Sequence, residues 1–243
     1  MKALLRYLLL LLVSAVALQL VFALRIAAMR LVDPQSTSLQ RSEIVRLLRE
    51  PAPLRWQQAW MPYERIADSM KRAVIASEDS GFTEHAGIDW EAIEKAWEKN
   101  QRAQARTEAA PRLAAAPQRL PKLVGASTIT QQLAKNLFLS SERSLPRKAQ
   151  EFVLSMMLEA LLSKERILEV YLNNVEWGAG VFGVRAAAQR YFGIDADRLA
   201  PMQAARLAVM LPAPKRFEKR PGSAYVSGRA ATVVARMGAV ELP

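Results

Sequence analysis

Residues 144–173 read SLPRKAQEFVLSMMLEALLSKERILEVYLN and contain two helical patterns in succession. Ser144 is a candidate N-cap for the first helix, and Pro146 falls in its first turn. The apolar side of this helix follows the i, i+3 and i+4 spacing of an amphipathic helix. It consists of Phe152, Val153, Met156, Met157, Ala160 and Leu161. The second helix is predicted over 163–173. Because a third pattern covers 201–211 and strand alternation is nearly absent, we expect a mainly α-helical domain.

An apolar segment precedes this domain. Residues 7–24, YLLLLLVSAVALQLVFAL, carry no charge. As a helix they would be about 27 Å long, close to the thickness of a bilayer's hydrocarbon core. A cleaved signal peptide is the rival interpretation, because residues 15–17 (AVA) resemble a cleavage site. Since the apolar run continues to Leu24, we expect an uncleaved transmembrane anchor over 1–30, a membrane-proximal connector over 31–62 and a globular domain over 63–243.

The composition limits the kinds of partner and site. The chain has a net charge of +11, with 34 basic and 23 acidic residues. Such an excess favours anionic partners, which include phospholipid headgroups, a diphosphate substrate and nucleic acid. The chain has no cysteine and one histidine, so disulfides, thiolate metal sites and histidine-rich metal sites are excluded. Basic residues flank the apolar segment on both sides, so charge does not decide its orientation.

One segment has little capacity to form a core. Residues 101–122, QRAQARTEAAPRLAAAPQRLPK, contain only Leu113 and Leu120 as large apolar residues. We therefore predict a mobile basic loop or flap between two ordered helices. A solvated insertion without a role is the alternative interpretation.

Three stretches carry more polar detail than packing requires. In 73–90, AVIASEDSGFTEHAGIDW, a helix from about residue 65 would place Glu78 and Asp79 in its last turn. Carboxylates there face the negative end of the helix dipole, which raises a carboxylate pKa or requires a nearby cation. Both conditions suit a general base, although solvated turn residues would give the same pattern.

The second and third stretches supply hydrogen-bonding groups and cations. In 125–139, GASTITQQLAKNLFL, Ser127 is a candidate N-cap. A helix from Thr128 would place Thr128, Gln132 and Lys135 on one face. On the helix after Ser144, the polar side consists of Lys148, Glu151, Ser155 and Glu159. Lys148 and Glu151 are three residues apart and can form an ion pair.

This inventory discriminates between two chemistries. A glycoside hydrolase must protonate a poor alkoxide leaving group, so it needs a carboxylic acid paired with a second carboxylate. A glycosyl diphosphate leaves as a stable anion and needs cations at its phosphates and one base for the attacking hydroxyl. The basic groups of this chain fit the second chemistry better.

The same residues resemble a known family. Residues 78–87, EDSGFTEHAG, resemble the ED-x-x-F-x-x-H-x-G signature of peptidoglycan glycosyltransferases. Residues 125–139 resemble the second motif of that family, and 147–151 (RKAQE) the R-K-x-x-E third motif. Residues 164–173 with the glycines that follow are similar to the fourth motif, and 208–214 (AVMLPAP) to the fifth. The match covers about 65–216 and is weakest at the 101–122 insertion. The chain ends soon after the fifth motif, with no room for the transpeptidase domain of bifunctional relatives. We therefore expect a monofunctional biosynthetic member of this family.

The resemblance implies a lysozyme-like fold with a smaller membrane-associated jaw, and an enzyme that polymerises lipid II into β-1,4 glycan strands. By motif position, Glu78 would deprotonate the acceptor 4-hydroxyl, which displaces undecaprenyl diphosphate from the donor with inversion. Lys135 and Arg143 would hold the donor diphosphate, with Lys148 close by. Glu151, the second expected catalytic residue, would orient this cluster or the acceptor. The other expected substrate-binding residues are Asp79, Phe82, His85, Ser127, Thr128 and Gln132.

Cofactor, partners and location follow from the same resemblance. No cofactor is expected to be obligatory, although a divalent cation could assist at the diphosphate. The expected partners are lipid II, the growing glycan chain, the membrane, and proteins of cell-wall synthesis or division. The expected location is the bacterial inner membrane, with one membrane span and the catalytic domain on the periplasmic side.

Three other functions fit parts of the sequence. A lysozyme-like enzyme would cleave glycan instead of building it. A non-catalytic envelope scaffold would bind glycan or assembly proteins through its basic surface. A nucleic-acid binder fits least, because the anchor opposes it and no recognised nucleic-acid motif accompanies the charge.

Overall fold

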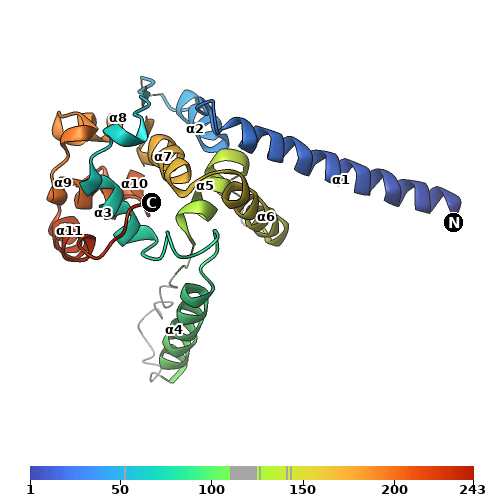
Figure 1. Cartoon of the computed structure of the whole chain (residues 1–243). Helices are drawn as coiled ribbons and strands as arrows, with labels where there is room; N and C mark the ends of the chain where they lie inside the picture. The colour runs from blue at the N-terminus through green and yellow to red at the C-terminus, as the bar shows by residue number, and fades with distance from the viewer. Residues whose placement is uncertain (52, 110–124, 126, 141, 143) are drawn as a thin grey trace.

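A computed structural model of the chain describes residues 1–51, 53–109, 125, 127–140, 142 and 144–243 (Figure 1). Its α-helices are α1 (Lys2–Ala28), α2 (Ser38–Leu48), α3 (Asp68–Glu78), α4 (Trp90–Ala109), α5 (Ile129–Phe138), α6 (Leu145–Leu161), α7 (Lys164–Asn174), α8 (Val184–Phe192), α9 (Pro201–Met210), α10 (Pro214–Phe217) and α11 (Ala224–Met237). Two 3-10 helices, η1 (Tyr63–Arg65) and η2 (Ala196–Arg198), and the strands β1 (Gln57–Gln58), β2 (Glu176–Gly178) and β3 (Val181–Phe182) complete the described elements. The prediction of a mainly α-helical domain is confirmed.

Several predicted helix boundaries are confirmed by their caps. Ser144 caps α6 by accepting a hydrogen bond from the Arg147 N–H, and the proline lies in the first turn. Ser163 caps α7 in the same way, and α9 begins at the predicted Pro201. The predicted connector over 31–62 contains α2, whose N-cap Thr37 forms a capping box with Gln40.

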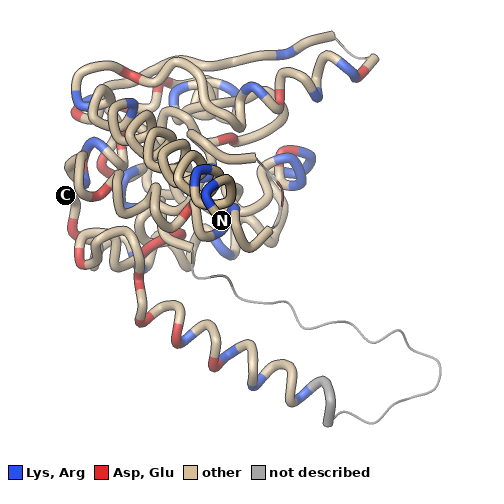
Figure 2. Tube along the Cα trace, turned by 90° about the vertical axis from the view of Figure 1, so that its right-hand side faces the viewer, with Lys and Arg blue, Asp and Glu red and all other residues tan. Residues whose placement is uncertain are grey.

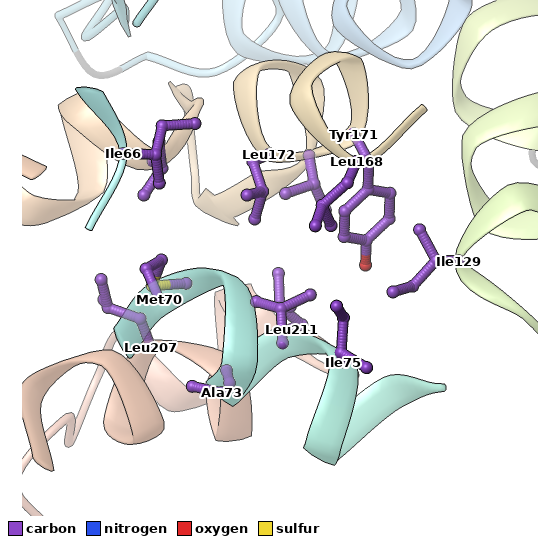
Figure 3. Packing of buried hydrophobic residues seen from close by; sticks show 14 of the residues in the cluster. Ile66, Met70, Ala73, Ile75, Ile129, Leu168, Tyr171, Leu172, Leu207 and Leu211 are labelled. Carbon is purple, nitrogen blue, oxygen red and sulfur yellow. The ribbon is translucent and has the colours of Figure 1, made fainter. Parts of the chain in front are cut away.

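The core fixes the helix that carries Glu78. Met70, Ala73 and Ile75 of α3 are buried, and Figure 3 shows them facing apolar side chains of α7 and α9. Helix α3 packs mainly against α9 and α11, and α5 packs against α6, α7 and α2. Fully burying one large apolar side chain contributes roughly 1.5–3 kcal/mol. This packing therefore holds the C-terminal end of α3 in a defined position beside α5.

A small sheet covers the junction between α7 and α8. Its strand order is β1-β3-β2, with β1 parallel to β3 and β2 antiparallel to β3. Gly180 lies between β2 and β3 with φ +70°, and a Cβ there would lie 2.0 Å from the carbonyl oxygen of Arg55. Only glycine allows this close approach of the backbone that precedes β1.

The polar and apolar sides of α6 differ in solvent exposure from those of an ordinary surface helix. Two residues of the side that the sequence marks as polar are buried, since Glu151 is 3% exposed and Ser155 is fully buried, whereas Lys148 of this side is exposed. On the side predicted to be apolar, Met156 is 45% exposed. Phe152 of that side makes an edge-on contact with the exposed Trp90 of α4, and Met157 lies beside α1. Glu151 and Ser155 are buried because this part of α6 packs toward α5 and the candidate site.

Residues 101–109 correct the prediction of a loop over 101–122. They continue α4, which projects from the other helices in Figure 1. Alanine, glutamine and arginine are good helix formers, and i, i+4 ion pairs such as Glu98–Arg102 add support. Figure 2 shows acidic and basic residues alternating along this helix. Residues 110–122 lie outside the described part of the chain.

Helix α1 matches the predicted anchor, and its C-terminal part docks on the globular domain. Its 27 residues are long and apolar enough to cross a membrane. The side-chain amides of Gln19 and Gln150 on α6 donate to each other, at 3.0 and 3.1 Å. Phe22 packs edge-on against Phe138, with ring centroids 5.4 Å apart. An amide pair in an apolar setting is strongly favoured over two unpaired amides.

We predict that this docking can be trapped by oxidation. The chain has no cysteine, so Gln19→Cys combined with Gln150→Cys introduces the only two thiols. Mild oxidation of membranes should form an intramolecular disulfide, detected as a shift in non-reducing electrophoresis that reductant reverses. Leu8→Cys with Gln150→Cys is the matched control, because position 8 is about 16 Å further along the helix. Equal cross-linking in both pairs would contradict the docking geometry.

Candidate active site

Glu78 is the last residue of α3, as the sequence predicts for a helix ending near residue 80. Its Oε2 accepts a hydrogen bond from Gln132 Nε2 at 3.0 Å. Burial raises the pKa of Glu78, and the neighbouring Asp79 charge acts in the same direction. Hydrogen bonds from Gln132 and Ser77 and the charge of Lys135 oppose this rise. The predicted direction of the pKa shift is confirmed, with burial as its main cause.

A partly buried chain of hydrogen bonds orients Glu78. The hydroxyl of Tyr171 on α7 donates to Gln132 Oε1 at 2.9 Å, and Gln132 in turn donates to Glu78. Tyr171 is fully buried, and burial raises its pKa well above the ordinary value. The phenol therefore stays neutral and keeps its proton for this hydrogen bond. Because Tyr171 fixes the amide, Gln132 presents its N–H groups toward the carboxylate of Glu78.

Asp79 joins the end of α3 to the start of α5. Its Oδ2 accepts the backbone N–H of Ile129 at 2.9 Å, in the first turn of α5. A carboxylate at a helix N-terminus is stabilised by the positive end of the dipole. Thr128 caps the same helix and also donates to the carbonyl of Gly87 at 2.7 Å. Through these hydrogen bonds, Asp79 and Thr128 hold the first motif (residues 78–87) against the second (residues 125–139).

His85 completes this support. Its Nδ1 accepts the N–H of Gly87 at 3.1 Å, so Nε2 carries the proton of the neutral ring and donates to Asp79 Oδ1 at 2.9 Å. Potential ligand atoms of Asp79, His85 and Asp89 lie within 4.8 Å of one another. Hydrogen bonds already occupy both oxygens of Asp79 and both nitrogens of His85. These groups fit a hydrogen-bonded support better than a set of ligands for a divalent cation.

Two cavities lie on either side of the Glu78–Gln132 pair. The first, about 520 Å³, is called the Glu78 cavity, and the second, about 390 Å³, the Lys135 cavity. The Glu78 cavity is lined by residues that include Glu78, Asp79, Asp89, Lys95, Lys99, Ser127, Thr128 and Arg236. The Lys135 cavity is lined by residues that include Ser42, Gln132, Lys135, Ser140, Arg147 and Glu176. Gln132 therefore connects the carboxylate in one cavity to the cations of the other.

The cations of the Lys135 cavity are organised by Glu151. Its two oxygens accept hydrogen bonds from Arg147, at 2.6 Å, and from Lys148. The predicted Lys148–Glu151 ion pair is therefore confirmed. Desolvation by the surrounding side chains lowers the pKa of Lys135, although this residue is partly exposed to solvent, and Arg147 and Lys148 lower the pKa further. Glu151 and Glu78 oppose this effect and favour the charged ammonium.

The structure brings most of the predicted site residues together, with corrections. Ser127 is exposed at the cavity rim and does not cap α5; Thr128 is the N-cap, so it lies just before the helix face of Gln132 and Lys135. Phe82 is fully buried under the ammonium of Lys164 and lines neither cavity. Arg143 lies outside the described residues, and its expected role stays a prediction.

Other residues at the site were not predicted as site residues from the sequence. Lys95 and Lys99 come from α4 and Arg236 from α11, far along the chain from the motifs. No local pattern distinguishes them from surface charges. Arg147 and Tyr171 stand inside the quoted motifs, so their positions carried a signal, but their contacts depend on how α5, α6 and α7 pack.

Comparisons with known proteins agree with this geometry. The family model described as transglycosylase matches residues 46–238. A biosynthetic peptidoglycan transglycosylase of Bordetella pertussis is 51% identical over 213 residues, covering 87% of this chain and 82% of its own length. Proteins of the same name from Burkholderia orbicola and Herminiimonas arsenicoxydans are 49% and 48% identical, each over 93% of this chain and over 86% and 91% of their own lengths. The chain therefore belongs to the transglycosylase family.

Proposed function

We propose that this chain is a peptidoglycan glycosyltransferase that polymerises lipid II into β-1,4 glycan strands and releases undecaprenyl diphosphate. The single observation that carries the proposal is the placement of Glu78 and Lys135 in adjoining cavities connected by Gln132. The family membership and the lysozyme-like helical domain support it. Lys135 supports the proposal further, because its charge acts on the carboxylate of Glu78 and Arg147 lines the same cavity as Lys135.

The acceptor saccharide occupies the Glu78 cavity in this mechanism. Its 4-hydroxyl donates to the carboxylate of Glu78, which removes the proton as the oxygen attacks C1 of the donor. Burial favours the neutral acid and so strengthens Glu78 as a base, while Gln132 keeps enough of it ionised. The tyrosine–glutamine chain prevents the carboxylate from rotating away from the hydroxyl.

The donor diphosphate occupies the Lys135 cavity. As the bond from C1 to the phosphate oxygen breaks, negative charge develops on the leaving diphosphate. The Lys135 ammonium and the Arg147 guanidinium line the cavity that receives this charge. Attack by the hydroxyl from the opposite side of C1 gives inversion. The proposed steps use only side chains of this protein. The expectation that no cofactor is obligatory stays a prediction.

Glycan cleavage is the second candidate activity, because Glu78 with its raised pKa could also act as a general acid. The cations of the Lys135 cavity favour polymerisation, since a stable diphosphate needs charge stabilisation and no proton. Purified full-length protein should convert labelled lipid II into glycan ladders on gels. The same preparation should release no soluble muropeptides from purified sacculi. Release of muropeptides without ladders would overturn the proposal.

The anchor supports a location beside the lipid substrate. We place α1 across the bacterial inner membrane and the catalytic domain on its periplasmic face. Protease added to intact spheroplasts should digest that domain, and full protection would contradict this orientation. Interactions with proteins of cell-wall synthesis or division remain a prediction.

A further inference from the structure

Glu176 is a buried carboxylate for which the proposed reaction has no role so far. It begins β2, is 8% exposed and lines the Lys135 cavity. Its Oε1 makes no directed hydrogen bond, although Lys215 Nζ forms an ion pair with it at 3.2 Å. Lys215 also donates to Glu43, so two carboxylates share one ammonium. Glu176 is therefore a carboxylate of the cavity wall that, among the described residues, is held only by an ammonium shared with Glu43.

A second unpaired atom lines the same cavity. Arg147 donates to Glu151 through Nη1, but its buried Nε has no hydrogen-bond partner among the described residues. A buried polar atom without a partner costs roughly 1–3 kcal/mol, and most such atoms in native proteins are paired. A carboxylate that shares one ammonium and a guanidinium N–H without a hydrogen-bond partner, both from residues that line one cavity, are the features expected of a site that a polar ligand completes.

Resting on the proposed function, we infer that Glu176 binds the donor saccharide by accepting a hydrogen bond from a sugar hydroxyl or an acetamido N–H. The phosphates are the less suitable partner, because a carboxylate repels them and Lys135 and Arg147 already provide cations. Glu176 comes from β2 and not from α5 or α6, so it can contact the sugar while those two helices hold the diphosphate. It would thus determine which sugar the cavity accepts.

The electrostatics of Glu176 agree with a binding role. Burial raises the pKa of its carboxyl to about 7, the nearby Glu43 acts in the same direction, and Lys215 and Arg46 oppose it. Keeping a buried carboxyl ionised costs desolvation free energy, so the ion pair with Lys215 does not by itself explain the position of Glu176. A ligand hydroxyl or N–H would supply the hydrogen bond that Oε1 lacks.

Donor binding can be measured without turnover. The probe is a short-chain lipid II analogue methylated at the 4-hydroxyl of its N-acetylglucosamine, so it cannot act as an acceptor. It is titrated into full-length Glu78→Gln protein in detergent, alone and combined with Glu176→Gln or Glu176→Ala. We expect affinity to fall about tenfold for Gln and up to about a hundredfold for Ala, as for lost hydrogen bonds to charged groups. Unchanged affinity in both would overturn the inference.

Two controls separate recognition of the sugar from other effects. Glu43→Gln removes a carboxylate from the same ion cluster, but Glu43 does not line the cavity, so affinity should stay within about twofold. An equal loss for Glu43→Gln and Glu176→Gln would assign the effect to the ion cluster and overturn the inference. Farnesyl diphosphate has no sugar, so the Glu176 variants should bind it like their parent. A parallel loss for this ligand would also contradict sugar recognition.

The outcome is distinguishable from failure of the proposed function. If protein without substitutions makes no glycan from lipid II, the proposed function fails whatever the Glu176 variants bind. If it polymerises lipid II while the Glu176 variants bind the methylated analogue normally, only the inference about Glu176 fails. Thermal unfolding of each variant checks that it is folded.

Discussion

Glu78→Gln should lower kcat for lipid II polymerisation by about a thousandfold, within the range of rate enhancement that general bases provide. Glutamine keeps the shape of the side chain and can still accept the hydrogen bond from Gln132, so the protein should fold. It cannot take the proton of the acceptor hydroxyl. The measurement is the initial rate at saturating lipid II, with thermal unfolding as the check on folding.

Glu84→Gln is the matched control for Glu78→Gln. Glu84 belongs to the same motif, but it is exposed and lines neither cavity, so its loss should leave kcat unchanged.

The pH dependence of activity is a second test of Glu78. Because burial raises the pKa of Glu78, activity should fall on the acid side at a pH above 4.5, the ordinary value. Gln132→Leu removes a hydrogen bond that lowers this pKa, so the acid limb should move to higher pH. Equal activity of the Glu78→Gln variant would remove Glu78 from the mechanism.

Local sequence signals determined the parts of the fold that depend on neighbouring residues. Ser144 caps its helix as predicted, because an N-cap interacts only with the next two or three residues, and the next helix begins within one residue of the predicted Ser163. The same reasoning chose Ser127 over Thr128, since both hydroxyls precede the helix. Thr128 is the cap because Gly87, 41 residues earlier, accepts its proton and positions it. No local pattern contains that contact.

Local sequence patterns also did not predict which side of α6 is buried, for a related reason. Periodicity distinguishes an apolar side from a polar side, but it does not identify the side that packs against the domain. Glu151 and Ser155 are buried because α6 contributes an ion cluster to the site, and Met157 of the apolar side contacts the anchor. Several of the site residues that the resemblance supplied line the two cavities, whereas the positions of Glu176 and Arg236 depend on tertiary packing alone.

Glu151→Gln should reduce activity by about a hundredfold or more and should also change its pH dependence. Glu151 is the carboxylate that pairs with both Arg147 and Lys148. Without it the two cations repel each other and Lys135, and the guanidinium loses the acceptor that orients it. The side chains of Arg147 and Lys148 are 17% and 47% exposed, so water compensates part of the lost pairing. We therefore expect a stability loss of about 1–3 kcal/mol, below the range for fully buried pairs.

The pH dependence separates this electrostatic role from a purely structural one. Lys135 must be protonated to hold the diphosphate, and burial lowers its pKa while Glu151 opposes that effect. Removing the Glu151 charge lowers this pKa further, so activity should be lost at a lower pH as the pH rises. Glu159→Gln is the matched control, because Glu159 is also a partly buried carboxylate of α6 but pairs with Lys164, away from Lys135. It should reduce stability and leave the basic limb in place. A basic limb that stays unmoved in Glu151→Gln would show that Glu151 acts through packing alone.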